Sequence, residues 1–317
     1  MTENGNDGAP GILAAGREGR RAVTRPIFVI GKNRSGTKWL SNILSSHPDV
    51  VSVQREGAGG IVETNLLLNF PAVFGDLRRP ENYCAMAAAF SKSNFFRCTG
   101  LPEKILFHRQ FDDYADFFRH VMHSFARRCA KRFWLQKADV LVLPMLYEAF
   151  PDARFVLIER NILDNIRSSV ALARLASNRK ASVLKEVALY QLASRTARRF
   201  AKRPRVLRIT YEALEAHREE ITRRACDHLG LSYSPHMLED RFERNTSFRN
   251  GIRRDEMLSW LDITCIRILG PLFRLIPLPA LSALRRWLGS ARDPRRSRFV
   301  PKSYSILRKE YGWPEEN

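Results

Sequence analysis

The stretch Ile27-Phe-Val-Ile-Gly31-Lys-Asn-Arg-Ser-Gly36-Thr-Lys-Trp-Leu40 joins an apolar strand to a loop with a glycine at each end, and the loop leads into a helix. The four residues Ile27 to Ile30 favour a buried strand, and apolar residues then recur at helical spacing until Pro48. A glycine loop before a helix directs unpaired backbone N–H groups and the positive end of the helix dipole at one point. The stretch therefore predicts a binding site for an anion such as phosphate.

The residues that follow the loop differ from those of a nucleotide-hydrolysing P-loop. Such loops read Gly-Lys-Ser/Thr, with the lysine on the β- and γ-phosphates and the hydroxyl on magnesium. Here the order is Gly36-Thr37-Lys38, and Trp39 stands where the metal-binding hydroxyl is expected. The loop thus indicates an anion but does not indicate magnesium and ATP.

Further strands and helices alternate along the chain. Apolar strands are predicted at 154–159 and 205–209, and helices at 111–133, 141–150, 161–175, 182–200 and 211–229. Strands alternating with helices predict an α/β fold, in which a parallel sheet lies between two helical layers. Ligands of such folds bind at the carboxyl ends of the strands, so we expect Gly31 and Arg160 to face one crevice.

Composition and charge describe a globular, strongly basic chain. With 317 residues, 44% of them hydrophobic, we predict a single domain over 26–317, preceded by a disordered lead-in over 1–25. The formal net charge of +20 is typical of proteins that meet an anionic substrate, nucleic acid or an acidic membrane surface. Charge alone does not choose among these partners.

Cysteine usage and hydropathy suggest a cytoplasmic protein. The five cysteines are an odd number without a Cys-x-x-Cys pair, so we expect reduced, mostly buried thiols. The chain shows neither a signal-peptide core nor the roughly 18 uninterrupted apolar residues of a membrane span. Residues 257–302 mix apolar clusters with arginines and prolines, which predicts a basic amphipathic helical extension. That extension could cap an acceptor pocket, lie on an anionic membrane surface, or complete the core as an ordinary helical pair.

Three motifs together resemble one known family. The loop Asn33–Trp39 resembles the 5′-phosphosulfate loop of sulfotransferases that use 3′-phosphoadenosine 5′-phosphosulfate (PAPS). Arg160 and Ser168, at the end of a strand and in the following helix, resemble the 3′-phosphate site of that family. Tyr211, in Arg208-Ile-Thr-Tyr-Glu-Ala-Leu214, resembles the family's tyrosine near the adenine. The resemblance spans residues 26–231 and implies a P-loop NTPase-like sulfotransferase fold.

The resemblance also implies which residues bind the co-substrate. PAPS carries a phosphosulfate and a 3′-phosphate, so it needs two anion sites, one built from a backbone loop and one from a guanidinium. The alternatives are a surface ion pair of Arg160 with Glu159 or Asp164, and a solvated helix position for Lys38. The implied PAPS-binding residues are Arg34, Ser35, Gly36, Thr37, Lys38, Trp39, Arg160, Ser168 and Tyr211.

Catalytic roles follow from the same resemblance. Arg34 occupies the position of a catalytic lysine in many cytosolic members; because arginine stays protonated, we expect it to stabilise charge on the leaving oxygen electrostatically. The histidine of the family's Lys-x-His segment is missing, and Lys137 resembles a lysine of bacterial-type members. Glu63 is the first choice for the general base, followed by Glu56 and His108, and a solvated surface glutamate is the alternative. Phe248–Arg254 resembles the family's Arg-Lys-Gly contact with the 3′-phosphate.

The leading hypothesis is therefore a PAPS-dependent enzyme that moves a sulfuryl group to a hydroxyl or amine in one in-line step without a metal. The acceptor is open among small molecules, lipids and glycans, and the oligomeric state is not predicted. One alternative is an ATP-dependent kinase-like phosphotransferase. The other is a non-enzymatic basic protein that binds nucleic acid or membrane, although the chain shows none of the usual motifs for specific nucleic-acid recognition.

Overall fold

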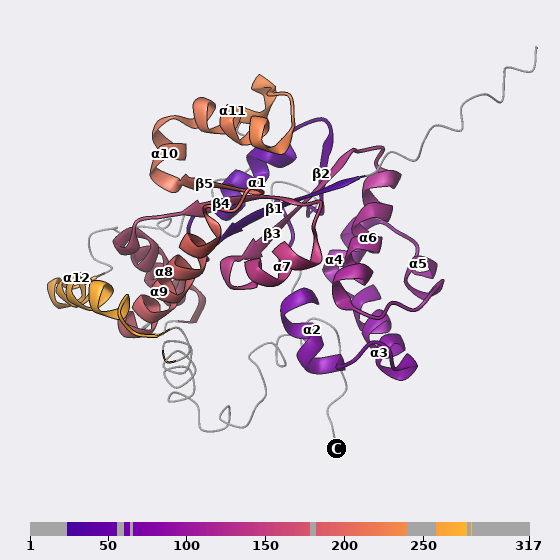
Figure 1. The fold of residues 1–317 in the computed structure, drawn as a ribbon, viewed down its shortest axis with the longest axis horizontal. Helices are drawn as coiled ribbons and strands as arrows, with labels where there is room; N and C mark the ends of the chain where they lie inside the picture. Colours follow the sequence, from indigo (N-terminus) through magenta and orange to yellow (C-terminus); the bar gives the residue numbers. More distant parts are fainter. Residues whose placement is uncertain are drawn as a thin grey trace, which may run out of the picture.

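A parallel β-sheet forms the centre of the molecule (Figure 1). The computed structural model describes residues 24–55, 60–63, 66–177, 182–239, 258–277 and 280. Within them, five strands pair in the order β2-β3-β1-β4-β5. Their bounds are β1 Arg25–Gly31, β2 Val50–Ser52, β3 Phe133–Asp139, β4 Arg154–Glu159 and β5 Val206–Thr210. β1 is the middle strand, since it pairs with β3 on one side and β4 on the other.

Helices cover both faces of the sheet, which confirms the predicted three-layer α/β fold (Figure 1). One face carries α1 (Thr37–Ser45), α10 (Tyr211–Ala216) and α11 (Arg218–Leu229). The other carries α6 (Tyr114–Arg128), α7 (Leu143–Ala149) and α9 (Val183–Phe200). The remaining elements are α2 (Leu66–Phe74), α3 (Pro80–Ser91), α4 (Asn94–Thr99), α5 (Lys104–Phe107), α8 (Ile162–Ser177), α12 (Trp260–Phe273), and the 3₁₀ turns Val140–Val142 and Pro235–Leu238.

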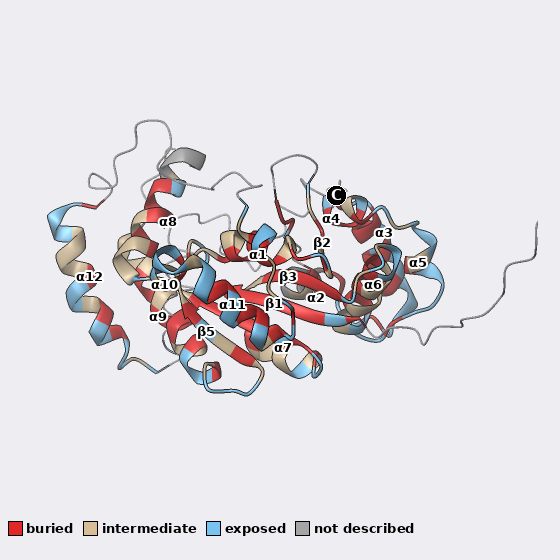
Figure 2. Ribbon diagram, turned by 90° about the horizontal axis from the view of Figure 1, so that it is seen from above, coloured by how far each residue is buried: buried red, intermediate tan, exposed pale blue. Residues whose placement is uncertain are grey.

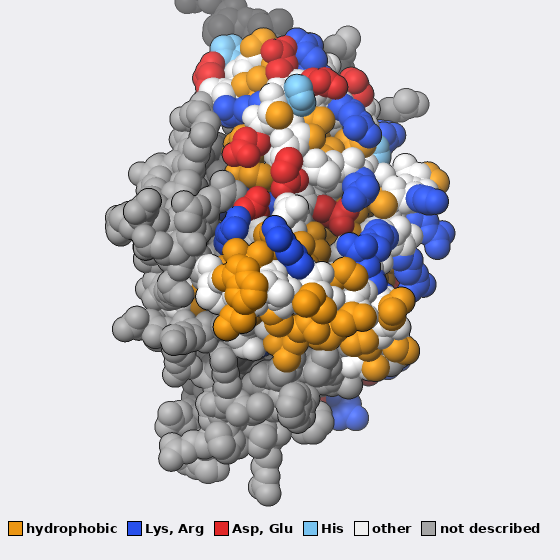
Figure 3. All heavy atoms as spheres, turned by 90° about the vertical axis from the view of Figure 1, so that its left-hand side faces the viewer, with side chains coloured by type: hydrophobic (Ala, Val, Ile, Leu, Met, Phe, Trp, Pro, Cys, Tyr) orange, Lys and Arg blue, Asp and Glu red, His pale blue; other side chains and the backbone are white. Residues whose placement is uncertain are grey.

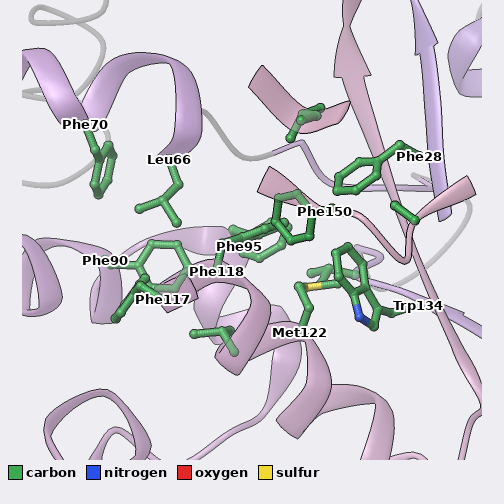
Figure 4. Packing of buried hydrophobic residues seen from close by; sticks show 14 of the residues in the cluster. Phe28, Leu66, Phe70, Phe90, Phe95, Phe117, Phe118, Met122, Trp134 and Phe150 are labelled. Carbon is green, nitrogen blue, oxygen red and sulfur yellow. The ribbon is translucent and has the colours of Figure 1, made fainter. Parts of the chain in front are cut away.

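The central strand is apolar because both of its faces are covered. Phe28 and Ile30 point into the cluster beneath α6 and α7, whereas Ile27 and Val29 point toward α1 and α11. The ring of Phe28 lies 5.4 Å from that of Trp134 and 5.1 Å from that of Phe150, between centroids (Figure 4). Buried residues line the strands and the inner sides of the helices (Figure 2). This packing holds β1 rigidly, and with it the loop that follows Gly31.

Most predicted elements are confirmed, but the helix predicted over 111–133 is α6, which ends at Arg128, and Phe133 begins β3. The predicted strands at 154–159 and 205–209 are β4 and β5, but the helix predicted over 211–229 breaks into α10 and α11 at His217, whose φ and ψ are −131° and 53°. The strands β2 and β3 were not predicted. β2 has only three residues, and β3 carries buried Gln136 and Lys137, which interrupt its apolar pattern.

The cysteines differ from the expectation in their burial. All five are free thiols, but only Cys226 is buried, and α3 turns Cys84 toward solvent. Residues 1–23 lie outside the described part of the chain, as do 257, 278–279 and 281–302 of the predicted C-terminal extension. Among the helices that the structure describes, none has both the length and the apolar content needed to cross a bilayer.

Candidate functional site

The loop between β1 and α1 is tightly wound. Arg34 and Gly36 have φ angles of 72° and 90°, in the left-handed region. A Cβ added to Gly31 would lie 2.6 Å from the carbonyl oxygen of Ile158, so the loop needs glycine there to pass β4. α1 begins without a side-chain cap, since Gly36 is its N-cap residue. The first amides of α1 therefore point, with the positive helix end, into the space that the loop surrounds.

Arg160, at the end of β4, packs against this loop. Its Nη1 donates a hydrogen bond to the carbonyl oxygen of Arg34 at 3.3 Å, and its guanidinium carbon lies 4.1 Å from the centroid of the Tyr211 ring. Its buried Nε has no hydrogen-bond partner in the described part of the chain. Among the described residues Arg160 has no ion-pair partner, while Glu159 pairs with Arg208 and Asp164 with Arg167. The arginine is thus held in place with one donor unused.

Helix α8 fixes the loop from the side. The buried Ser168 hydroxyl accepts a hydrogen bond from Arg34 Nε at 2.9 Å. Asn165, one turn earlier, is fully buried, and its Nδ2 donates to the carbonyl oxygen of Asn33 and to the Ser35 hydroxyl, both at 3.0 Å. Sequence reasoning missed Asn165. The signal for it is its position three residues before Ser168, on the same helix face.

Two guanidiniums are brought together in this space. Burial, and then the charge of Arg160, lower the pKa of Arg34 from its ordinary value. Like charges held close together in partly buried positions are unfavourable unless an anion lies between or beside them. The pair Arg34 and Arg160 therefore makes this end of the sheet a receptor for negative charge.

Aromatic rings border the loop on the side of α10. The Trp39 and Tyr211 rings lie 5.6 Å apart between centroids, at an interplanar angle of 58°. A Cβ on Gly36 would lie 2.6 Å from Cδ2 of Tyr211, so the ring contacts the loop backbone directly. Arg160 covers the same ring, which joins the predicted adenine, loop and 3′-phosphate residues in one cluster.

A second group of charges lies at the end of β3. The buried Lys137 forms an ion pair with the exposed carboxylate of Glu63. Burial lowers the pKa of Lys38, the nearby charges of Arg55 and Lys137 lower it further, and Glu63 opposes them. Lys38 is partly buried and lies within electrostatic range of Glu63 and Lys137 beside the loop.

Of the other two candidate bases, His108 lies in the described part of the chain and Glu56 does not. His108 follows α5, where its ring stacks on His120 at 4.6 Å and its Nδ1 lies 2.8 Å from the carbonyl oxygen of Ile105. In Figure 1, α5 lies on the far side of α6 from the sheet, so the structure does not bring His108 to the loop. Glu56 and 248–254 lie outside the described residues.

A pocket opens between the loop, the end of β4 and α9. It is partly open to solvent, and its lining includes Lys32, Ser35, Arg160 and Tyr190. Lys32 forms an ion pair with Glu186 of α9 at 3.1 Å, and the Tyr190 hydroxyl donates to the carbonyl oxygen of Arg160 at 2.6 Å. These contacts of α9, which the sequence did not predict, tie it to both halves of the site.

Comparison with known proteins assigns the chain to a family. A family model described as the sulfotransferase family matches residues 26–235. The chain belongs to the sulfotransferase family. This match covers β1, the loop, α8 and Tyr211, and it ends before α12. The family predicted from the three motifs is thereby confirmed, while the roles of individual residues stay predictions.

Solved sulfotransferases resemble the chain at low identity. The sulfotransferase domain from the curacin biosynthetic pathway is 15% identical, with 92% of this chain and 99% of that chain covered and a TM-score of 0.47. STF1 from Mycobacterium tuberculosis H37Rv is 18% identical, with 68% and 70% covered and a TM-score of 0.43. Mouse SULT7A1, solved with PAP, is 12% identical, with 85% and 91% covered and a TM-score of 0.47. No curated protein matches the sequence.

Proposed function

We propose that this sulfotransferase moves a sulfuryl group from PAPS to a hydroxyl or amine of its acceptor, without a metal. The observation that carries the proposal is the placement of Arg34 and Arg160 at the carboxyl ends of the neighbouring strands β1 and β4. One guanidinium belongs to a glycine loop at a helix start and the other to a strand end. This arrangement suits a ligand with two separate anionic groups.

The residues present fit PAPS. The loop amides, with Thr37 and Lys38, would hold the phosphosulfate, and the unused buried Nε of Arg160 offers a donor to the 3′-phosphate beside Ser168. The rings of Tyr211 and Trp39 provide apolar surface for the adenine. When bound, PAPS supplies the sulfuryl group attached to a phosphate that can leave.

In this proposal Arg34 lowers the barrier by electrostatics. The guanidinium stabilises the negative charge that develops on the bridging oxygen as the sulfur–oxygen bond breaks, and Lys38 adds a second cation. Removing one such donor typically lowers the rate by about 10²–10³. Arginine does not give up its proton in proteins, so Arg34 acts as a charge and not as an acid.

Glu63 is proposed as the base that takes the proton of the acceptor. Its carboxylate lies beside Lys38 and is held by Lys137, whose position in β3 is fixed by the sheet. In this proposal the ion pair with Lys137 keeps the carboxylate near the end of β3, where the acceptor would approach the sulfur.

A titration tests the proposal directly. Isothermal titration of the full chain with 3′-phosphoadenosine 5′-phosphate, in excess EDTA, should show tight binding. Binding of ATP that requires magnesium, with no binding of the 3′-phosphorylated nucleotide, would overturn it in favour of a phosphotransferase. Incubation of lysate fractions with PAPS labelled in the sulfur then identifies the acceptor among lipid, carbohydrate and small-molecule pools.

A further inference from the structure

Helix α12 has an outer face that is apolar and exposed. Seven large hydrophobic side chains are exposed in the described part of the chain, and five of them belong to α12 and the turn after it. Their exposed fractions range from 51% to 81%. Figure 3 views the molecule from this side and shows hydrophobic side chains gathered together, with Lys and Arg beside them. The five residues, named here the outer face of α12, are Trp260, Leu261, Ile268, Leu272 and Leu275.

This outer face is not needed for the fold. The opposite side of α12 is already packed, because Ile266, Gly270 and Phe273 are buried against α8 and α9. A Cβ on Gly270 would lie 3.6 Å from Gln191 and from Ile162, which shows how closely the helix approaches its neighbours. A helix that is apolar on both sides, and that the described part of the chain covers on only one of them, marks an interaction surface.

Two arginines border the outer face. Arg267 and Arg274 are exposed at its edge, and Asp262, the single carboxylate of α12, is engaged in a capping box with Ser259. The sequence after α12 carries seven basic residues and one acidic residue between 281 and 302, within a chain of net charge +20. A partner that complements the outer face therefore has a negatively charged surface with an apolar layer beneath it. The seven basic residues are Arg285, Arg286, Arg292, Arg295, Arg296, Arg298 and Lys302.

We propose that the outer face of α12 docks on an anionic lipid bilayer, with the helix lying in the plane of the interface. The apolar side chains enter the boundary between headgroups and acyl chains, and the arginines contact lipid phosphates. Pairing of two copies through this face would bring their basic edges together, which disfavours a dimer there. The docking proposal is independent of the proposed transfer reaction.

Vesicle binding tests the proposal with the full-length chain. Cosedimentation with vesicles of phosphatidylcholine and phosphatidylglycerol in equal parts should retain the wild type, and vesicles of phosphatidylcholine alone should retain much less. The double variant Leu261→Ser/Ile268→Ser should bind the anionic vesicles about tenfold or more weakly, since each side chain loses its transfer into the lipid. In Trp260→Phe, the blue shift of tryptophan fluorescence on vesicle binding should largely disappear.

Phe107→Ser is the matched control, because Phe107 is exposed to a similar degree but lies on α5, away from the outer face. It should bind vesicles like the wild type, and all variants should keep the wild-type unfolding temperature. Three results would each overturn the proposal. These are a wild type that does not bind anionic vesicles, a double variant that binds them as well as the wild type does, and a Phe107→Ser variant that loses as much vesicle binding as the double variant. A wild-type dimer that the double variant dissociates, without vesicle binding, would assign the face to self-association instead.

Discussion

At the scale of single residues, Arg34 combines backbone strain with a partly buried charge. A left-handed φ of 72° costs a residue other than glycine about 1 kcal/mol, so contacts elsewhere must hold it. Asn165 supplies two of them, one on either side of Arg34, through Asn33 and Ser35. The strained turn directs the Arg34 side chain toward Ser168 and its carbonyl oxygen toward Arg160.

Arg160→Ala should weaken binding of 3′-phosphoadenosine 5′-phosphate by about 10- to 100-fold, because a charged hydrogen-bonding group to phosphate contributes about 1.5–3 kcal/mol. Titration calorimetry measures the change. Arg208→Ala is the control, since Arg208 lies on the next strand and pairs with Glu159 at the surface. Unchanged affinity in the Arg160 variant would refute its assignment to the 3′-phosphate.

Glu63→Gln should lower turnover by about 10²–10⁴ while the affinity for the nucleotide stays unchanged, because a general base acts on the acceptor and not on PAPS. The measurement uses an acceptor found with labelled PAPS. Glu219→Gln, which removes an exposed carboxylate paired with Arg223 on α11, should have wild-type turnover. Wild-type turnover in the Glu63 variant would show that another residue acts as the general base.

At the scale of elements, the sheet, its strand ends and α8 place the site. The sequence allowed β4 and the position of Arg160 to be predicted, since an unbroken apolar run ends there. β3 was not predicted because the polar residues Gln136 and Lys137 interrupt its apolar pattern, although both are buried. The break between α10 and α11 at His217 was not predicted because no glycine or proline marks it. Contacts such as Lys32–Glu186 depend on distances between elements, which residue patterns do not encode.

Replacing Gly36 tests how the loop and α10 fit together. Gly36 and Gly230 have φ angles of 90° and 71°, but only at Gly36 would a Cβ meet the Tyr211 ring, since nothing lies within 4 Å at Gly230. Both alanine variants should lose about 1 kcal/mol of unfolding free energy from the backbone, measured in urea. Gly36→Ala should also lose nucleotide affinity in calorimetry, whereas Gly230→Ala should not. Equal nucleotide affinity in the two variants would contradict the close fit of ring and loop.

At the scale of the whole molecule, stability depends on pH through a partly buried histidine in the helical layer beyond the sheet. His120 of α6 stacks on His108, and its buried Nε2 has no partner in the described part of the chain. Burial, and then the neighbouring His108, lower the pKa of His120 from 6.5 to about 4. Between pH 6.5 and about 4, His120 is therefore protonated in the unfolded chain and neutral in the folded chain.

The stability of the folded protein should fall as the pH falls from 6.5 toward 4, and His120→Gln should reduce that fall. The contribution is roughly 1–2 kcal/mol once partial exposure is allowed for. Urea unfolding at pH 7 and pH 5 measures it, with the exposed His236→Gln as the control. A pH dependence that is the same in wild type and His120→Gln would show that this histidine keeps its ordinary proton affinity.

The register of the central strand governs how the molecule can be made. Arg25 pairs with Phe133 and Ile27 with Arg154, so β1 leaves the ribosome long before either neighbouring strand exists. Until β4 has been synthesised, the apolar strand β1 has no partner on that side. Unpaired apolar strands are prone to aggregate. The loop between β1 and α1 can adopt its tightly wound conformation only after Ile158 and Asn165, which contact it, have been synthesised. Fragments that end before β4 should therefore need a chaperone to remain in solution, and none of them should contain a formed loop.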